Sequence, residues 1–78
     1  QMCIETGQEL IRNGIAASEV LEPMCEIING EPLAHIDYVS MVDALSMQPV
    51  DSVNADVLVA MAVYIGKTRL IDNFSYEV

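Results

Sequence analysis

The sequence predicts an α+β fold with two layers, in which two N-terminal helices pack on a small three-stranded antiparallel sheet. Apolar residues recur at helical spacing in two segments before residue 30. An alternating segment and a continuous apolar run follow, and a Gly-Lys pair separates that run from a last apolar segment. Helices grouped before strands in one short chain are typical of the α+β class. With 78 residues, we expect residues 1–78 to form a single domain.

The first predicted helix covers residues 3–13. Its apolar side chains lie on one side of the helix, together with Gly7; they are Cys3, Ile4, Leu10 and Ile11. The pair Asn13-Gly14 is a natural stop, because Gly accepts the left-handed conformation that ends many helices.

The second predicted helix covers residues 18–28. Its apolar stripe consists of Val20, Leu21, Met24, Ile27 and Ile28. Ser18 is the expected N-cap, and Asn29-Gly30 ends the helix. Pro23 removes one helical hydrogen bond, so the helix either kinks there or begins at Pro23.

Three strands are expected in the second half of the chain. Residues 33–43 alternate as in a half-buried strand, with Ala34, Ile36, Tyr38 and Val42 on one face and His35, Asp37 and Asp43 on the other. Residues 44–56 form a polar connection with room for one short turn of helix. The apolar run 57–65 predicts a strand covered on both faces, with a buried helix as the alternative. Gly66-Lys67 is then a two-residue hairpin turn leading to a return strand over residues 68–73.

Charge and cysteine content exclude several classes of function. Three Lys and Arg residues against twelve Asp and Glu residues give a net charge of −9. Nucleic acids and anionic membranes are therefore poor partners, since both need a basic surface. We expect no membrane span and no secretory leader, because no apolar run reaches about 18 residues and no basic-then-apolar stretch opens the chain. Two cysteines are too few for a disulfide framework, which favours the reducing cytoplasm.

The residues alone predict no complete catalytic site and no metal site. One His and two Cys at a separation of 21 residues give no usual ligand spacing. Gly66-Lys67-Thr68 resembles the end of a phosphate-binding loop, but Met61 stands where the first glycine is required. His35 and Asp37 share a strand face, as a general base and its partner would, yet no nucleophile accompanies them.

Lys67 and Arg69 are two of the three cations in the chain and lie together at the predicted turn. Two interpretations remain open. Arg69 pairs with Asp37, Asp43 or Asp72 across the sheet, or both cations reach an anionic ligand held by a partner domain. Either way, the chain is interpreted as a module: a lid, an interaction domain or one part of a larger enzyme.

Two motifs in the right order resemble the C-terminal part of the pantothenate synthetase (pantoate–β-alanine ligase) family. They are EPLAHIDYV at 31–39, followed by VD at 42–43 and LSMQPV at 45–50, and GKTRLIDN at 66–73. Residues 69–73 are the most telling, and residues 4–30 fit the helical lead-in less specifically. One departure is His35, where the family usually has Arg.

The resemblance implies an ATP-dependent ligase, with Mg for the full enzyme. Pantoate is adenylated with release of pyrophosphate, and β-alanine then attacks the acyl adenylate to give pantothenate and AMP. The signatures of the Rossmann-like nucleotide-binding domain, His-x-Gly-His among them, are absent from this sequence. The resemblance therefore assigns the chain to the C-terminal lid domain, whose partner is the N-terminal catalytic domain and which reaches ATP, pantoate and β-alanine through that domain.

Further expectations follow from the residues and the resemblance together. No family catalytic residue falls on a position of this chain, and we expect the isolated chain to bind no cofactor and to be inactive. The missing initiator Met at Gln1 suggests a fragment. Lys67 and Arg69 are expected on a hairpin that faces the catalytic domain. The alternative is an independent, small, acidic protein-interaction module.

Overall fold

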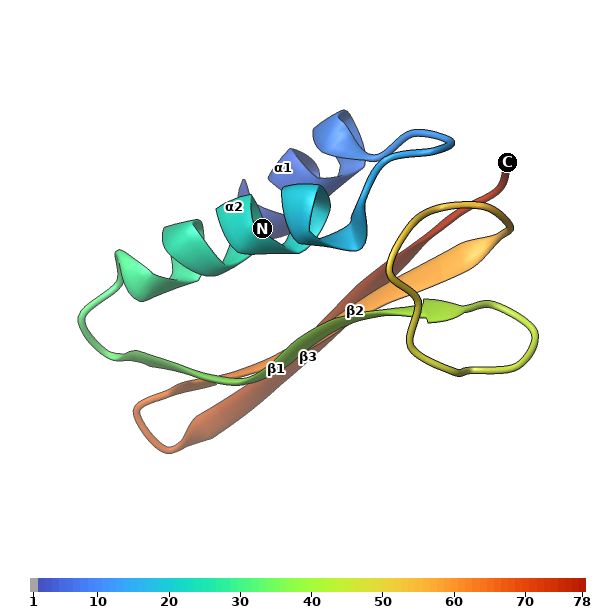
Figure 1. The fold of residues 1–78 in the computed structure, drawn as a ribbon. Coiled ribbons are helices and arrows are strands. Elements are labelled where there is room, and N and C mark those ends of the chain that lie inside the picture. The colour runs from blue at the N-terminus through green and yellow to red at the C-terminus, as the bar shows by residue number, and fades with distance from the viewer. Residues whose placement is uncertain (1) are drawn as a thin grey trace.

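A computed structural model describes residues 2–78 and confirms the predicted two-layer α+β arrangement (Figure 1). Its elements are α1 (Met2–Leu10), α2 (Ala17–Asn29), β1 (Ala34–Asp43), β2 (Val57–Ile65) and β3 (Thr68–Tyr76). The sheet is antiparallel with the order β1-β2-β3, and both helices lie over one of its faces. We call this the helix face, and the opposite side of the sheet the open face.

The helices differ from the prediction mainly at their ends. α1 ends at Leu10, although Ile11 still donates its backbone N–H to the Gly7 carbonyl at 3.0 Å. Ser18 is not the N-cap of α2: Ala16 holds that position, and no side chain caps it. The main chain of a loop caps the helix instead, since the Asp51 carbonyl accepts a hydrogen bond from the Ala17 N–H at 2.7 Å.

α2 continues through Pro23 and does not begin there. Proline removes one hydrogen bond from the helix interior. The buried stripe that packs the helix on the sheet offsets this loss; it consists of Ala17, Val20, Met24 and Ile28. Burial of an amphipathic face, more than local propensity, sets the extent of helices in proteins.

A β-bulge at Asp37 reverses the predicted orientation of the second half of β1. Ile36 pairs with Val63 and Tyr38 pairs with Ala62, so Asp37 is the extra residue between them. Beyond the bulge Val39 and Met41 face the helices, and Met41 is 2% exposed. Tyr38 and Val42 lie on the open face, and their predicted place in the core is wrong. One inserted residue inverts the alternation of a strand.

The central strand β2 is covered on one face only, which corrects the prediction of cover on both. Its core-facing residues are Val57, Val59, Met61 and Val63. On the open face Tyr64 is 39% exposed, whereas the small Ala62 is fully buried between its cross-strand neighbours Tyr38 and Ile71. The predicted strand is confirmed, and the alternative of a buried helix is wrong.

The predicted hairpin turn is confirmed. Ile65 pairs with Thr68, which leaves Gly66 and Lys67 as the two loop residues. Gly66 has φ +60°, a left-handed value that glycine adopts without a steric cost. β3 then runs to Tyr76, three residues beyond the predicted end of the return strand.

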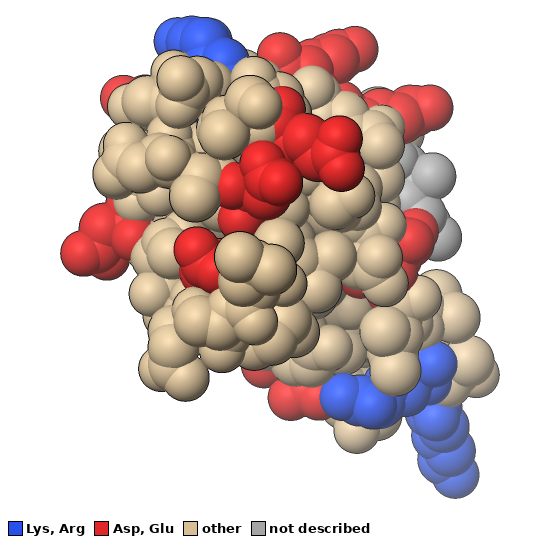
Figure 2. All heavy atoms as spheres, turned by 90° about the vertical axis from the view of Figure 1, so that its right-hand side faces the viewer, with Lys and Arg blue, Asp and Glu red and all other residues tan. Residues whose placement is uncertain are grey.

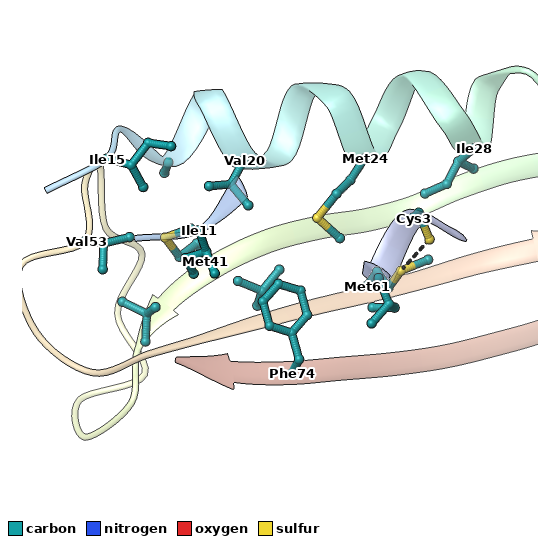
Figure 3. Packing of buried hydrophobic residues seen from close by; sticks show 14 of the residues in the cluster. Cys3, Ile11, Ile15, Val20, Met24, Ile28, Met41, Val53, Met61 and Phe74 are labelled. Carbon is teal, nitrogen blue, oxygen red and sulfur yellow. Dashed lines mark hydrogen bonds between the residues drawn. The ribbon is translucent and has the colours of Figure 1, made fainter. Parts of the chain in front are cut away.

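The core lies between the helix face of the sheet and the two helices, and loops complete it (Figure 3). Met24 of α2 and Phe74 of β3 project into its centre, and the Cys3 thiol lies 3.4 Å from the Met61 sulfur. Ile15 and Val53 come from connections, and Val53 is fully buried. The connection 44–56, predicted to be polar, thus supplies a core residue.

Candidate functional surface at the β2–β3 hairpin

Lys67 and Arg69 lie close together at the tip of the β2–β3 hairpin, as predicted. Lys67 is the second residue of the turn, and Arg69 lies opposite Tyr64 on the open face. The third cation, Arg12, follows α1. In Figure 2 the Lys and Arg atoms form two separate groups at opposite corners of the view, with acidic side chains scattered between them. The hairpin tip is thus a small basic site on an acidic protein.

Arg69 forms an ion pair with Asp37, which decides among the partners expected from the sequence. The Nε and Nη2 atoms of Arg69 lie 3.2 and 3.0 Å from Asp37 Oδ2. The bulge in β1 brings this carboxylate across the central strand. The hydrogen bond to Asp37 raises the pKa of Arg69 above its ordinary value. Both side chains remain about 40% exposed, at 41% and 39%, so water screens the pair.

The other two carboxylates expected as partners for Arg69 instead accept hydrogen bonds from backbone N–H groups. Asp72 Oδ1 accepts the backbone N–H of Asn73 at 2.8 Å. Asp43 Oδ1 accepts the N–H groups of Leu45 and Ser46, each at 2.9 Å, and orders the start of the β1–β2 connection. These two backbone hydrogen bonds, from Ser46 first and then from Leu45, lower the pKa of Asp43.

His35 and Asp37 are close in sequence, but the structure gives them different surroundings. His35 pairs with Tyr64 in the sheet register, whereas Asp37 is bulged and engaged by Arg69. In residues 2–78 no three His, Cys, Asp or Glu side chains gather where they could hold a metal ion. No helix in the same range is long and apolar enough to cross a membrane.

The sequence did not reveal an apolar groove at the hairpin end of the helix face. This hairpin groove has a volume of about 580 Å³ and lies where the start of α1, the end of α2 and the β2–β3 hairpin meet. Its apolar lining includes Met2, Ile28, Ala34, Met61, Ile65 and Leu70. The acidic residues among those that line it are Glu31 and Asp72. The sequence signal for this groove was the pair Leu70-Ile71 in the return strand. Because alternate residues of a strand face opposite sides, two consecutive apolar residues place apolar side chains on both faces.

Comparison with known proteins gives a family match over nearly the whole chain. Residues 2–75 match the family described as Pantoate-beta-alanine ligase. The chain is 51% identical over 74 residues to the pantothenate synthetase of Ruminiclostridium cellulolyticum, covering 94% of this chain and 26% of that protein. It is 45% identical over 74 residues to the pantothenate synthetase of Clostridium botulinum, covering 95% of this chain and 24% of that protein. It is 47% identical over 70 residues to the pantothenate synthetase of Clostridioides difficile, covering 90% of this chain and 25% of that protein. The chain spans about a quarter of the length of these curated relatives, and it belongs to the pantoate–β-alanine ligase family.

Proposed function

We propose that this chain is the C-terminal domain of an ATP-dependent pantoate–β-alanine ligase and closes as a lid over the active site of an N-terminal catalytic domain. The observation that carries the proposal is the family match over residues 2–75, combined with a span of 26% of the R. cellulolyticum relative. A chain that matches almost completely but covers only a quarter of its relatives corresponds to one of their domains.

A lid suits the chemistry of this reaction. A pantoyl adenylate formed from pantoate and ATP, with release of pyrophosphate, is attacked by the amine of β-alanine to give pantothenate and AMP. Water competes with β-alanine for the same acyl carbon, so closure that excludes water directs the adenylate to product. ATP, with its Mg, binds to the catalytic domain in this proposal, and the reaction takes place in the cytoplasm.

The hairpin tip is the part of this domain that we assign to the active-site side. Lys67 and Arg69 are the cations of the hairpin, and ATP and pantoate are anionic. Lys67 is exposed at the turn and can approach a phosphate or carboxylate directly. Arg69 keeps its ion pair with Asp37 and adds positive charge beside it.

The proposal is tested with a chimera in which residues 2–75 replace the matching segment of the R. cellulolyticum relative. The assay measures AMP formed with ATP, pantoate and β-alanine. We expect activity within about tenfold of the parent enzyme, a difference of about 1.4 kcal/mol in the barrier. The parent enzyme without this segment is the control. A chimera that is folded, as judged by cooperative unfolding, but no more active than the truncated control would contradict the proposal.

A further inference from the structure

The chain contains two Asn-Gly pairs, Asn13-Gly14 and Asn29-Gly30, and both asparagines are exposed. In such a pair the side-chain carboxamide carbon of the asparagine is within reach of the backbone nitrogen of the next residue. Glycine has no Cβ to hinder the approach of the two atoms. The two pairs therefore have similar intrinsic reactivity, and their surroundings in the fold decide which one reacts.

The reaction open to an Asn-Gly pair is deamidation, with water as its co-reactant. The glycine nitrogen loses its proton to solvent and bonds to the asparagine Cγ, which closes a succinimide ring. The bond from Cγ to the side-chain nitrogen breaks, and that nitrogen takes up a proton and leaves as ammonia. Water then opens the ring at either carbonyl and gives aspartate or isoaspartate. Ring closure requires that the glycine N–H first leave its hydrogen bond.

The nitrogen of Gly14 is held in a ladder that joins the α1–α2 connection to the β1–β2 connection. Its N–H donates to the Val53 carbonyl at 2.7 Å, and the Val53 N–H donates to the Ile15 carbonyl at 2.9 Å. Ile15 and Val53 lie in the core, at 7% and 0% exposure (Figure 3). Release of the Gly14 N–H therefore separates the two connections and exposes core side chains, which makes it a rare opening of the chain. We call this contact the Val53 ladder.

The nitrogen of Gly30 is held by the last turn of α2. Its N–H is shared between the Glu26 and Ile27 carbonyls, at 3.1 and 3.2 Å. Asn29 is the last residue of the helix, and Gly30 is exposed. Helix ends fray, and unwinding this end requires no movement of the buried Ile28. Release of the Gly30 N–H is therefore a frequent, local opening.

We propose that Asn29 is the site at which this chain is modified by deamidation, and that the Val53 ladder protects Asn13 from the same reaction. The product has a carboxylate at the C-terminal end of α2, where the helix dipole disfavours negative charge. An isoaspartate also adds a methylene to the main chain directly before the connection from α2 to β1. The modified chain therefore holds the end of α2 less firmly. This modification is independent of the ligase activity proposed above.

The test follows both asparagines in one sample of the chain at mildly alkaline pH, because base promotes loss of the glycine N–H proton. A glutamate-specific protease places Asn13 in peptide 10–19 and Asn29 in the peptide that begins at residue 27. Mass spectrometry with fragmentation then measures, at each site, the gain in mass when OH replaces the side-chain NH2. A second sample in concentrated urea gives the rate at each site without the fold.

Relative to urea, we expect folding to slow the reaction at Asn13 at least about tenfold more than at Asn29, because only release of the Gly14 N–H opens the core. Equal slowing at the two sites, or stronger slowing at Asn29, would overturn the proposal. If the chain alone does not unfold cooperatively, the chimera described above, which carries both pairs, takes its place in this comparison.

Gly30→Ala is the matched variant for the chemistry. Gly30 has φ −74° and ψ −11°, values that alanine adopts readily, so the end of α2 is retained. The added Cβ hinders attack on Asn29, and we expect modification there to be largely lost while the rate at Asn13 stays the same. An unchanged rate at Asn29 would show that the glycine nitrogen is not the nucleophile, and would overturn the proposal.

Val53→Ala is the variant that tests the protection of Asn13. Removing core contacts of Val53 loosens the ladder, so we expect the reaction at Asn13 to be faster and that at Asn29 to be unchanged. If Val53→Ala does not fold, the milder Ile15→Val replaces it. An unchanged rate at Asn13 in a folded variant with lowered stability would contradict the protective role of the ladder.

Discussion

At the scale of single residues, Asp37 organises the one basic site of the sheet. It is the extra residue of the β1 bulge, and its carboxylate holds the guanidinium of Arg69. From the sequence, Asp37 was one of three carboxylates expected to pair with Arg69, because several carboxylates lie within reach of one arginine in the predicted sheet. The bulge, which has no clear signature in the sequence, selects Asp37.

Removing both cations of the hairpin tests whether this site serves the ligand or only the fold. In the active chimera, the double change Lys67→Ala, Arg69→Ala should raise the apparent KM for ATP or pantoate by roughly tenfold, the worth of a charge-assisted hydrogen bond. Arg12→Ala is the control, because Arg12 follows α1 away from the hairpin, and it should leave KM unchanged. Unchanged kinetics in the double variant, with a lower free energy of unfolding, would assign the pair a purely structural role.

Asp43 gives the stability of the chain a dependence on pH. Its pKa is lowered in the folded state by the N–H groups of Ser46 and Leu45. A lowered folded-state pKa stabilises the fold above the unfolded-state pKa, and this contribution is lost as pH falls through the folded-state value. The difference in urea midpoint between the native chain and Asp43→Asn should therefore be largest near neutral pH and shrink as the pH falls below about 4. A difference that stays constant over this range would show that ionised Asp43 does not stabilise the turn.

At the scale of elements, the periodicity of the sequence located every helix and strand, but only some of their ends and faces, the ends of β2 among them. The two helical stripes and the apolar run of β2 are long enough to identify an element. The predicted Ser18 cap failed because the start of α2 is held by the backbone of the 44–56 connection, a contact between residues distant in the sequence. The face of Tyr38 was wrong because one bulged residue reverses the alternation.

The contact between α1 and the sheet depends on Gly7. A methyl group at this position would lie 2.7 Å from the Met24 sulfur and 2.9 Å from the Phe74 ring. Gly7→Ala gains roughly 1 kcal/mol of helix propensity. Overpacking of a filled core costs roughly 1–3 kcal/mol, so we expect a net loss of about 1 kcal/mol in the free energy of unfolding.

The measurement for Gly7→Ala is urea denaturation, with Gln8→Ala as the control because the Gln8 side chain is exposed. That control should change stability by less than about 0.5 kcal/mol. A Gly7→Ala chain that is more stable than the native one would contradict this prediction. It would mean that α1 can move away from Met24 and Phe74 without lowering the free energy of unfolding.

At the scale of the whole molecule, the chain has a well-packed core on one side of its sheet and exposed apolar or aromatic side chains at the open face and the hairpin groove. The open face carries Tyr38 and Tyr64 at 38% and 39% exposure, and the hairpin groove exposes Leu70 and Met2. The family motifs led from the sequence to the correct family. The groove could not be predicted in the same way, because it is defined by where α1 begins relative to the hairpin.

In the proposed enzyme, this domain protects the pantoyl adenylate, a reactive intermediate formed on the catalytic domain. The most direct measurement is the ratio of pantothenate to AMP produced by the chimera that carries residues 2–75 and by the host enzyme truncated before that segment. We expect one pantothenate for each AMP with the domain in place. Without it, AMP should form in excess as water consumes the pantoyl adenylate. A truncated enzyme that still couples every AMP to one pantothenate would show that this domain does not protect the intermediate.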